Sequence, residues 1–425
     1  MYVLMAVEYR RFVFPNYQHL MGFQFVLSPL PIILGVLFLA LLVYLLFFMR
    51  RSERDELYPV AMIVALLFCL PAIVMYQFGG ITVFVPLYGL LFLGLLCLPI
   101  GLPRPLLKEG RGLPRFLRAY RGVHPYTKEG NWRKGVLPVV CLLCLLPFPL
   151  AFGWNLDFSL LGMGEEIYDV RAEVATKNTL LTAYLLGPLR MVLLPMLIVY
   201  GLTDLKHSWW MTLLGVCALV FLYLLNPQKS IFFAIPVVLA MFCFKDWRAK
   251  AGVVLYGLLL ACAATALMHI ATGALLPESI VLRRLFFIPI LVCDNYFSFF
   301  DGNPLYLSHS VLGHWIDYPY DLEPSRVIGQ VMYGSEAVTN CNTGVLGDGF
   351  MNFGHIGAIL FVALCALYIR IECAVMDNPR FFGLVALLVY TFLNSALFTT
   401  LLTHGGLVLL LASLFFIPKG KEATC

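Results

Sequence analysis

Charged side chains are scarce in this chain. They make up 12% of its 425 residues, whereas hydrophobic residues make up 61%. A water-soluble domain of this composition would expose a large apolar surface, so that class of protein is excluded. The composition indicates an all-α polytopic membrane protein in contact with the lipid bilayer, and we expect no nucleic-acid partner.

Metal-binding and redox motifs are also lacking. Most of the twelve cysteines lie in apolar runs, where a thiol behaves as a small hydrophobic side chain. Cys141 and Cys144 form a CxxC pair within VVCLLCLL, but no second pair or histidine is nearby, which disfavours a metal or redox centre. The first residues, MYVLMAV, are too short for a signal-peptide core and meet Glu8 and Arg10 at once. We therefore expect no cofactor.

Apolar runs of membrane-spanning length are what the sequence has in abundance. A helix needs about 20 residues to cross the hydrocarbon layer. Eleven runs approach or exceed this length: Val26–Met49, Leu57–Phe78, Ile81–Leu102, Val136–Trp154, Thr179–Leu202, Trp209–Leu225, Ile231–Phe244, Ala251–Leu276, Phe353–Ile371, Phe381–Leu402 and Gly406–Pro418. The sequence thus predicts 11 to 12 spanning helices in a single membrane domain.

The basic segment at residues 103–135 sets the orientation. It holds nine Lys and Arg residues against two Glu residues, so the positive-inside rule makes it cytoplasmic. Its GLPRFLRAYRGVH stretch favours an amphipathic helix on anionic headgroups. The clusters at Arg50, Arg51 and Arg54 and at Lys245–Lys250 fall on the same side. This agreement requires that Ile280–Phe300 does not cross the membrane. It also places the N-terminus outside, unless a further N-terminal segment restores an inside start.

Two polar segments fall on the outer side, at residues 155–178 and 279–352. The second contains a re-entrant or interfacial helix at its start, followed by many acidic and aromatic residues. Such a loop is longer than a helix connection requires. Carboxylates and ring faces suit a sugar ligand, although a folded, solvated loop would have the same composition.

Four basic residues lie within or next to apolar runs, where a charged side chain is energetically unfavourable. Arg190 lies half-way through an apolar run, Lys229 joins two runs, and Arg283 and Arg284 follow another. Each would be explained singly as an anchor at the lipid surface. Together on one face they would bind a polyanion, and paired guanidinium hydrogen bonds suit a pyrophosphate.

The order of these features resembles a known family. Lys229 lies between two spans, RRLFFIP follows at residues 283–289, and a long loop ends in NTGVLGDGFMNFGHIG at residues 342–357. From about Asn155 onward this resembles the Wzy-type oligosaccharide repeat-unit polymerases, or O-antigen polymerases. The N-terminus departs from the family, which has an additional complete helix there.

The resemblance implies a GT-C-like fold and a metal-independent, inverting glycosyltransferase of the bacterial inner membrane. Such an enzyme acts at the periplasmic face on undecaprenyl-pyrophosphate-linked oligosaccharides. It transfers the growing glycan to the non-reducing end of a new lipid-linked unit. A chain-length regulator is a further expected partner.

Residue roles follow from this resemblance together with general chemistry. Fixed cations stabilise a pyrophosphate leaving group, and a carboxylate or imidazole within reach accepts the proton of the acceptor hydroxyl. The expected pyrophosphate ligands are Arg283, Arg284, Lys229 and Arg190, with Arg171 for a second pyrophosphate. The expected bases are Asp348, His314 and Glu336, followed by His309, and the expected glycan-binding residues are Asn342, Asn352, Tyr296 and Trp315.

Asp348 leads among the bases because Gly344, Gly347 and Gly349 would let the backbone approach a ligand closely. Capping of the following helix is the alternative role of Asp348, and equally of Asn342 and Asn352.

Two other functions remain open. An O-antigen ligase would use the same donor with a lipid A core acceptor, but the RRLFFIP and NTGVLGDG blocks favour the polymerase. A lipid or ion transporter would also bury Arg190, but transporters commonly contain internal repeats, and the sequence has no repeated halves.

Overall fold

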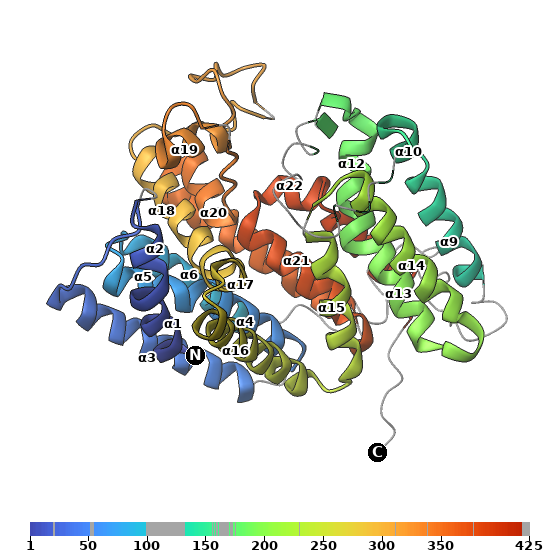
Figure 1. Cartoon of the computed structure of the whole chain (residues 1–425), viewed down its shortest axis with the longest axis horizontal. Coiled ribbons are helices and arrows are strands. Elements are labelled where there is room, and N and C mark those ends of the chain that lie inside the picture. The colour runs from blue at the N-terminus through green and yellow to red at the C-terminus, as the bar shows by residue number, and fades with distance from the viewer. Residues whose placement is uncertain are drawn as a thin grey trace. The chain divides into compact units, whose positions relative to one another are not determined.

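The computed structural model describes most of the chain: residues 1–19, 22–51, 55–98, 132–154, 156, 158, 160, 170, 173–174, 176–228, 230–310, 312–337, 339–376 and 378–418. Over these ranges the fold is all-helical and contains no strand (Figure 1). The predicted basic segment falls almost entirely outside the described residues, as does most of the segment at residues 155–178.

Eight helices in the described ranges are long and apolar enough to cross a membrane: Pro29–Arg51, Asp55–Phe78, Lys134–Phe152, Leu180–Thr203, Leu205–Leu225, Trp247–Thr272, Val345–Val375 and Leu397–Phe415. Three shorter apolar helices lie at Phe84–Cys97, Phe233–Cys243 and Pro379–Asn394. Each of the eleven predicted runs therefore contains a helix, and the prediction of a polytopic membrane protein is confirmed.

The chain divides into two compact units. Unit 1 comprises Met1–Ile100, Trp247–Arg370 and Val389–Leu397. Its helical elements are α1 (Tyr2–Glu8), η1 (Tyr9–Val13), α2 (Phe14–Tyr17), α3 (Pro29–Arg51), η2 (Asp55–Leu57), α4 (Tyr58–Val64), η3 (Ala65–Cys69), α5 (Leu70–Phe78), α6 (Phe84–Cys97), α16 (Trp247–Thr272), α17 (Leu275–Glu278), η7 (Ser279–Phe287), α18 (Ile288–Phe299), α19 (Pro324–Tyr333) and most of α20 (Val345–Val375).

Unit 2 comprises Gly101–Asp246, Ile371–Leu388 and Phe398–Cys425. Its elements are α9 (Trp132–Leu145), α10 (Pro147–Phe152), α12 (Leu180–Pro188), η6 (Leu189–Leu193), α13 (Leu194–Thr203), α14 (Leu205–Leu225), α15 (Ser230–Cys243), η8 (Pro379–Phe381), the first part of α21 (Phe382–Asn394), most of α22 (Leu397–Leu402) and α23 (Gly406–Phe415).

Within the described residues four segments are π-helical, namely η1, η3, η6 and η7. In each case a proline is the second residue after the segment: Pro15, Pro71, Pro195 and Pro289. A proline inside a helix has no N–H to donate, and its ring crowds the carbonyl group of the preceding turn. Widening that turn relieves the crowding without breaking the helix.

Contacts between two long helices of unit 1 show their relative direction. Arg248 Nε lies 3.2 Å from Asp55 Oδ1, which joins the starts of α16 and of the Asp55–Phe78 helix. Since α16 also packs along α4, these two helices run in the same direction and finish at the same end of unit 1. We call this the loop end, and we call the opposite end, which carries Arg50, Arg51 and Arg248, the basic end.

The segment predicted not to cross the membrane forms one continuous helix of 25 residues, from α17 through η7 to α18. It is not among the eight helices suited to span a membrane. Near its start, Glu278 bonds to His269 in the last turn of α16. Near its other end, the backbone N–H and the hydroxyl of Thr82, in the α5–α6 turn, donate to Asp294 at 2.9 and 2.8 Å. Both ends of this helix therefore contact the loop end of unit 1.

Two boundaries differ from those predicted. The run Phe381–Leu402 is not one helix, because α21 ends at Asn394 and α22 begins at Leu397. Before α3, residues Tyr2–Tyr17 form a continuous helix whose Met5, Tyr9 and Phe12 side chains are buried. The additional N-terminal segment left open by the sequence is thus a packed helix, although it is not among the eight helices of spanning length.

Candidate functional site

The arginine pair of η7 lies beside aromatic side chains from two other elements. Arg283 is half-buried, and its guanidinium carbon lies 4.3 Å from the ring centre of Tyr17 at the end of α2. Its Nε donates a hydrogen bond of 3.0 Å to the hydroxyl oxygen of Ser279. Arg284 is exposed. Tyr333, the last residue of α19, is close enough to both guanidinium groups to feel their charge. We call Tyr17, Arg283, Arg284 and Tyr333 the arginine cluster.

The electrostatics of the arginine cluster favour an anion. Burial lowers the pKa of Arg283, Tyr17 raises it, and the neighbouring Arg284 lowers it again. A guanidinium group stays protonated despite such shifts. The charge of Arg283 is therefore held in a partly dry place beside a like charge, and an anionic ligand would relieve both costs.

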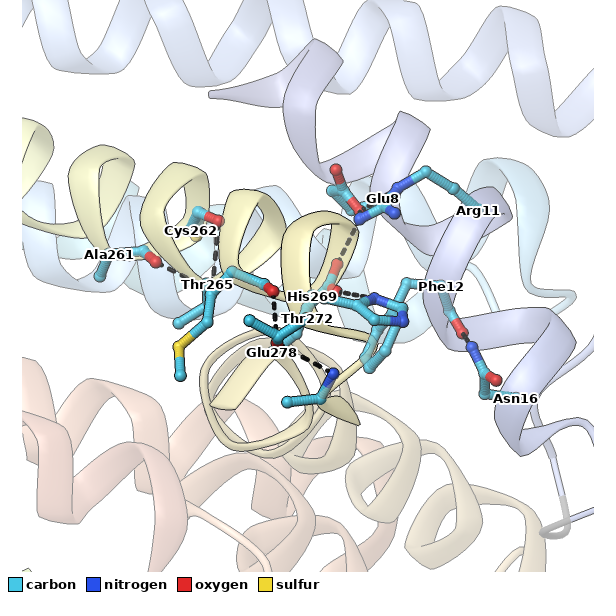
Figure 2. A network of polar contacts seen from close by, with 12 residues as sticks. Glu8, Arg11, Phe12, Asn16, Ala261, Cys262, Thr265, His269, Thr272 and Glu278 are labelled. Carbon is cyan, nitrogen blue, oxygen red and sulfur yellow. Dashed lines mark hydrogen bonds and ion pairs between the residues drawn. The ribbon is translucent and has the colours of Figure 1, made fainter. Parts of the chain in front are cut away.

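A buried polar network anchors the start of η7 (Figure 2). Nη2 of Arg11 donates to Glu8 at 2.6 Å and to Glu278 at 2.5 Å. The carboxyl group of Glu278 also bonds to Nδ1 of His269. Because Ser279 directly follows Glu278, this network ties the N-terminal helix and α16 to the segment that carries Arg283.

The surroundings of Glu278 favour its protonated form. Burial raises the pKa of Glu278, and its hydrogen bond with Glu8 raises it further, while His269 and Arg11 lower it. Two carboxyl groups can hydrogen-bond to one another only when one of them is protonated. The network therefore combines ion pairs from Arg11 to both carboxyl groups with a raised pKa at Glu278.

Asp348 lies within a buried network at the loop end of unit 1. Its side chain is 3% exposed. Oδ2 accepts a hydrogen bond of 2.8 Å from the backbone N–H of Leu397, and Oδ1 accepts one of 3.1 Å from the amide of Asn352. Asp348 therefore caps α22, which starts at Leu397, instead of capping the helix in which it lies.

Asn352 holds a loop against a break in α20. Its Oδ1 accepts from the backbone N–H of Leu307 at 2.9 Å, and its backbone carbonyl accepts from the N–H of Tyr306 at 3.0 Å. Tyr306 and Leu307 have φ angles of 51° and 60°, which non-glycine residues rarely adopt. The helix breaks at Gly354, where φ is 61°. Asn352 is fully buried, so in this structure it supports the loop rather than facing a ligand.

The glycines around Asp348 serve contacts within the chain. A Cβ atom on Gly344 would lie 2.3 Å from the carbonyl oxygen of Leu393, and one on Gly349 would lie 2.4 Å from that of Gly357. These glycines let backbone segments of unit 1 pack together.

The other predicted site residues between positions 279 and 352 differ in the exposure of their side chains. His314, Glu336 and Asn342 are exposed, and Trp315 is 78% exposed. Tyr296 is instead buried, and its hydroxyl group donates to the carbonyl oxygen of Cys341 at 3.0 Å.

His309 lies between these extremes. It is half-buried, and its ring centre lies 6.3 Å from that of Tyr318. Burial lowers the pKa of His309, and Glu323 opposes this shift. His309 is therefore neutral near pH 7 and able to accept a proton.

Arg190 occupies a separate setting in unit 2. It is buried in η6 and donates a hydrogen bond to the side chain of Gln228. Pro188 does not break the helix, which continues as a π-helical turn. Arg190 thus contacts the residue that precedes Lys229. Lys229 itself lies outside the described residues, as does Arg171.

A turn at residues 403–405 approaches Arg190 closely. His404 is near enough to interact electrostatically with the guanidinium group. A Cβ atom on Gly187 would lie 2.0 Å from the carbonyl oxygen of Thr403, so only glycine permits this approach. The structure therefore groups Arg190 with Gln228 and His404, whereas Arg283 and Arg284 belong to the arginine cluster of unit 1.

Two further features were missed by the sequence reasoning. The first is a spacing: Arg10, Arg190 and Arg284 each stand five residues before the proline that follows a π-helical segment. The motif R-x4-P marks these positions, but it also occurs at Arg133–Pro138, where the described helix contains no π-helical segment. It would also have added Arg10, whose guanidinium carbon lies 5.5 Å from the ring centre of Phe25.

The second feature is an exposed histidine just after the break in α20. Nδ1 of His355 lies 2.8 Å from the hydroxyl group of Tyr88, and its ring centre is 4.4 Å from that of Phe84 and 5.1 Å from that of Phe350. The GHIG sequence contains this histidine, but no spacing in the sequence indicates its aromatic neighbours.

Comparisons with known proteins do not assign the chain to a family. A scan against protein-family models, a search of curated proteins and a search of solved structures each find no match.

Proposed function

We propose that this protein is a membrane glycosyltransferase that polymerises undecaprenyl-pyrophosphate-linked oligosaccharide repeat units. In this proposal it lies in the bacterial inner membrane with a GT-C-like fold of 11 to 12 spans, and its loop end faces the periplasm. The growing glycan is transferred to the non-reducing end of a new lipid-linked unit, with inversion at the anomeric carbon.

The arginine cluster is the observation that carries the proposal. Two adjacent arginines lie on a helix whose ends both contact the loop end, opposite Arg50, Arg51 and Arg248. If the basic end is cytoplasmic, the arginine cluster lies on the outer side, against the usual charge bias. A ligand with several negative charges explains why these arginines are there.

The chemistry requires charge stabilisation more than covalent catalysis. The acceptor hydroxyl oxygen attacks the anomeric carbon of the donor, the bond from that carbon to the pyrophosphate oxygen breaks, and the hydroxyl proton passes to a base. Negative charge develops on the departing undecaprenyl pyrophosphate. Arg283 and Arg284 stabilise that charge, because preorganised cations in a partly dry site need little rearrangement during the reaction.

The cations of unit 2 complete the proposed binding of lipid pyrophosphates. Arg190 is buried, so an anion that reached it would be strongly attracted. We assign Arg190 and Lys229 to the binding of a lipid pyrophosphate, and Arg171 to the pyrophosphate of the acceptor lipid.

The base is proposed to lie in the outer loop. Both carboxylate oxygens of Asp348 are engaged by Leu397 and Asn352, so we assign Asp348 a positioning role. His314 and Glu336 are exposed and able to meet an acceptor sugar, and half-buried His309 is the third candidate. Trp315 presents its ring to solvent and suits stacking on a sugar face.

Purified protein with a defined undecaprenyl-pyrophosphate oligosaccharide tests the proposal. Lengthening of the lipid-linked oligosaccharide in the presence of EDTA is the expected result. Transfer only when a lipid A core acceptor is added would indicate the ligase instead. Movement of the substrate between membrane leaflets without any change in its length would indicate a transporter.

A further inference from the structure

The basic end of unit 1 contains a pocket that the proposed reaction does not use. Phe47, Arg50 and Arg51 at the end of α3 and Arg248 at the start of α16 line a volume of about 580 Å³. Three guanidinium groups from elements almost 200 residues apart in sequence therefore face one space. Arg51 is held in place by Phe47, since its guanidinium carbon lies 4.2 Å from the ring centre.

The two helices that meet at this pocket expose apolar surface along their lengths. Only 17% of the apolar window of α3 and 22% of that of α16 is buried, against 89% for the Asp55–Phe78 helix. Both α3 and α16 pack on α4, the first regular turns of that buried helix. In Figure 1, α3 and α16 flank α4 and reach the basic end near one another. The pocket thus lies where two lipid-facing helices meet the membrane surface.

We propose that this pocket binds the phosphodiester headgroup of an anionic phospholipid. Arginine forms paired hydrogen bonds with phosphate oxygens, and the acyl chains would lie along the exposed faces of α3 and α16. A zwitterionic lipid is disfavoured, because its ammonium group would approach the same three guanidinium groups. Arg248 also forms an ion pair with Asp55, with its Nε 3.2 Å from Oδ1.

The position of the pocket selects a lipid over a soluble phosphate. A free phosphate would gain nothing from the apolar faces of α3 and α16, whereas a phospholipid buries its chains against them. The inference does not depend on the proposed glycosyl transfer, because the pocket lies at the basic end and the arginine cluster lies near the loop end.

Phospholipid binding to protein purified in a neutral detergent tests the proposal. Native mass spectrometry would count bound phosphatidylglycerol on the wild type, on Arg50→Gln/Arg51→Gln and on the control Lys206→Gln/Lys245→Gln. The control removes the same number of charges from exposed positions outside the pocket. We expect the pocket variant to bind one phosphatidylglycerol fewer, with an affinity about 30-fold lower than that of the wild type, and the control to bind as the wild type does.

Three outcomes would overturn the proposal. One is equal loss of phosphatidylglycerol in the pocket variant and in the control, which would indicate a general surface effect. Another is equal binding of phosphatidylcholine and phosphatidylglycerol. The third is a rise in Tm with inorganic phosphate as large as the rise with phosphatidylglycerol, which would assign the site to a soluble anion. The Tm of each variant in detergent alone reports whether it is folded, and Arg51→Lys, which keeps the charge, is expected to retain part of the binding.

Discussion

Replacement of Arg283 by alanine is the most direct perturbation of the arginine cluster. The side chain contributes a charge beside Arg284, a stacking contact with Tyr17 and a hydrogen bond to Ser279. The contacts within the protein are worth about 1 kcal/mol each in stability, so the variant should fold and insert with a modestly lower Tm.

The loss of activity should be far larger than the loss of stability. Removal of one preorganised group that stabilises developing negative charge lowers kcat by about 100-fold to 1000-fold. Arg283 is half-buried, so water replaces its charge less well than it would at an exposed position. Arg283→Lys keeps the charge but loses the planar fork, and we expect an intermediate kcat for it.

The assay follows the length of a glycan on undecaprenyl pyrophosphate after incubation with purified variants. Arg326→Ala serves as a control, because Arg326 is an exposed arginine of the outer loop whose Nε donates to Asn340 at 3.3 Å. Products of wild-type length and rate from Arg283→Ala would refute the assignment. Equal loss in Arg326→Ala would show that the effect reflects the total charge of the outer loop.

Three further predictions test the surrounding structure. Burial raises the pKa of Glu278 above its ordinary value of 4.5. The folded protein therefore binds this proton more tightly than the unfolded chain does, which stabilises the fold at low pH. This stabilisation is lost as the pH rises through the raised pKa. Glu278→Gln should therefore flatten the fall of Tm as the pH rises above 4.5, and an unchanged slope would contradict the raised pKa. Asp348→Ala leaves the N–H of Leu397 without its acceptor and should lower stability by about 1–3 kcal/mol; unchanged Tm with abolished turnover would instead make Asp348 the base. Trp315→Ala should leave Tm unchanged and raise KM for the lipid-linked oligosaccharide by about threefold to tenfold, as loss of one ring contact does, whereas an unchanged KM would exclude sugar stacking.

Hydropathy predicted the helices well because a membrane-spanning helix must have a long apolar run, which hydropathy records directly. Each of the eleven apolar runs contains a helix. It failed between Asn394 and Leu397, where the chain stays apolar but the helix ends. The cap of the new helix comes from Asp348, 49 residues earlier in the chain. A contact of that range leaves no trace in a local window of sequence.

Site residues were predictable where a charged side chain lies in an apolar surrounding. They were not predictable where the contacting residues are far apart in the sequence. A charged residue in or beside an apolar run is a recognisable signal in the sequence, as at Arg190, Arg283 and Arg284. No local pattern indicates that the N-terminal helix supplies Tyr17 to Arg283, or that Arg11, paired with Glu8, holds the start of η7 through Glu278. These contacts join residues more than 260 positions apart.

The prolines explain how the chain keeps these arginines inside helices at fixed positions. Pro71 follows a π-helical segment that contains no arginine, so the arginine is not what widens the turn. Pro138 and Pro236 are each the seventh described residue of their helices, and no π-helical segment precedes either of them there.

In the described residues, each π-helical segment is followed by a proline that lies within a longer helical run. An arginine placed five residues before such a proline lies in the widened turn itself, as Arg10, Arg190 and Arg284 do. Irregular turns of this kind recur at functional sites, where they redirect a side chain without ending the helix. Arg190 and Arg284 lie in widened turns of this kind, and their contacts with Gln228 and Tyr333 act on residues of those turns.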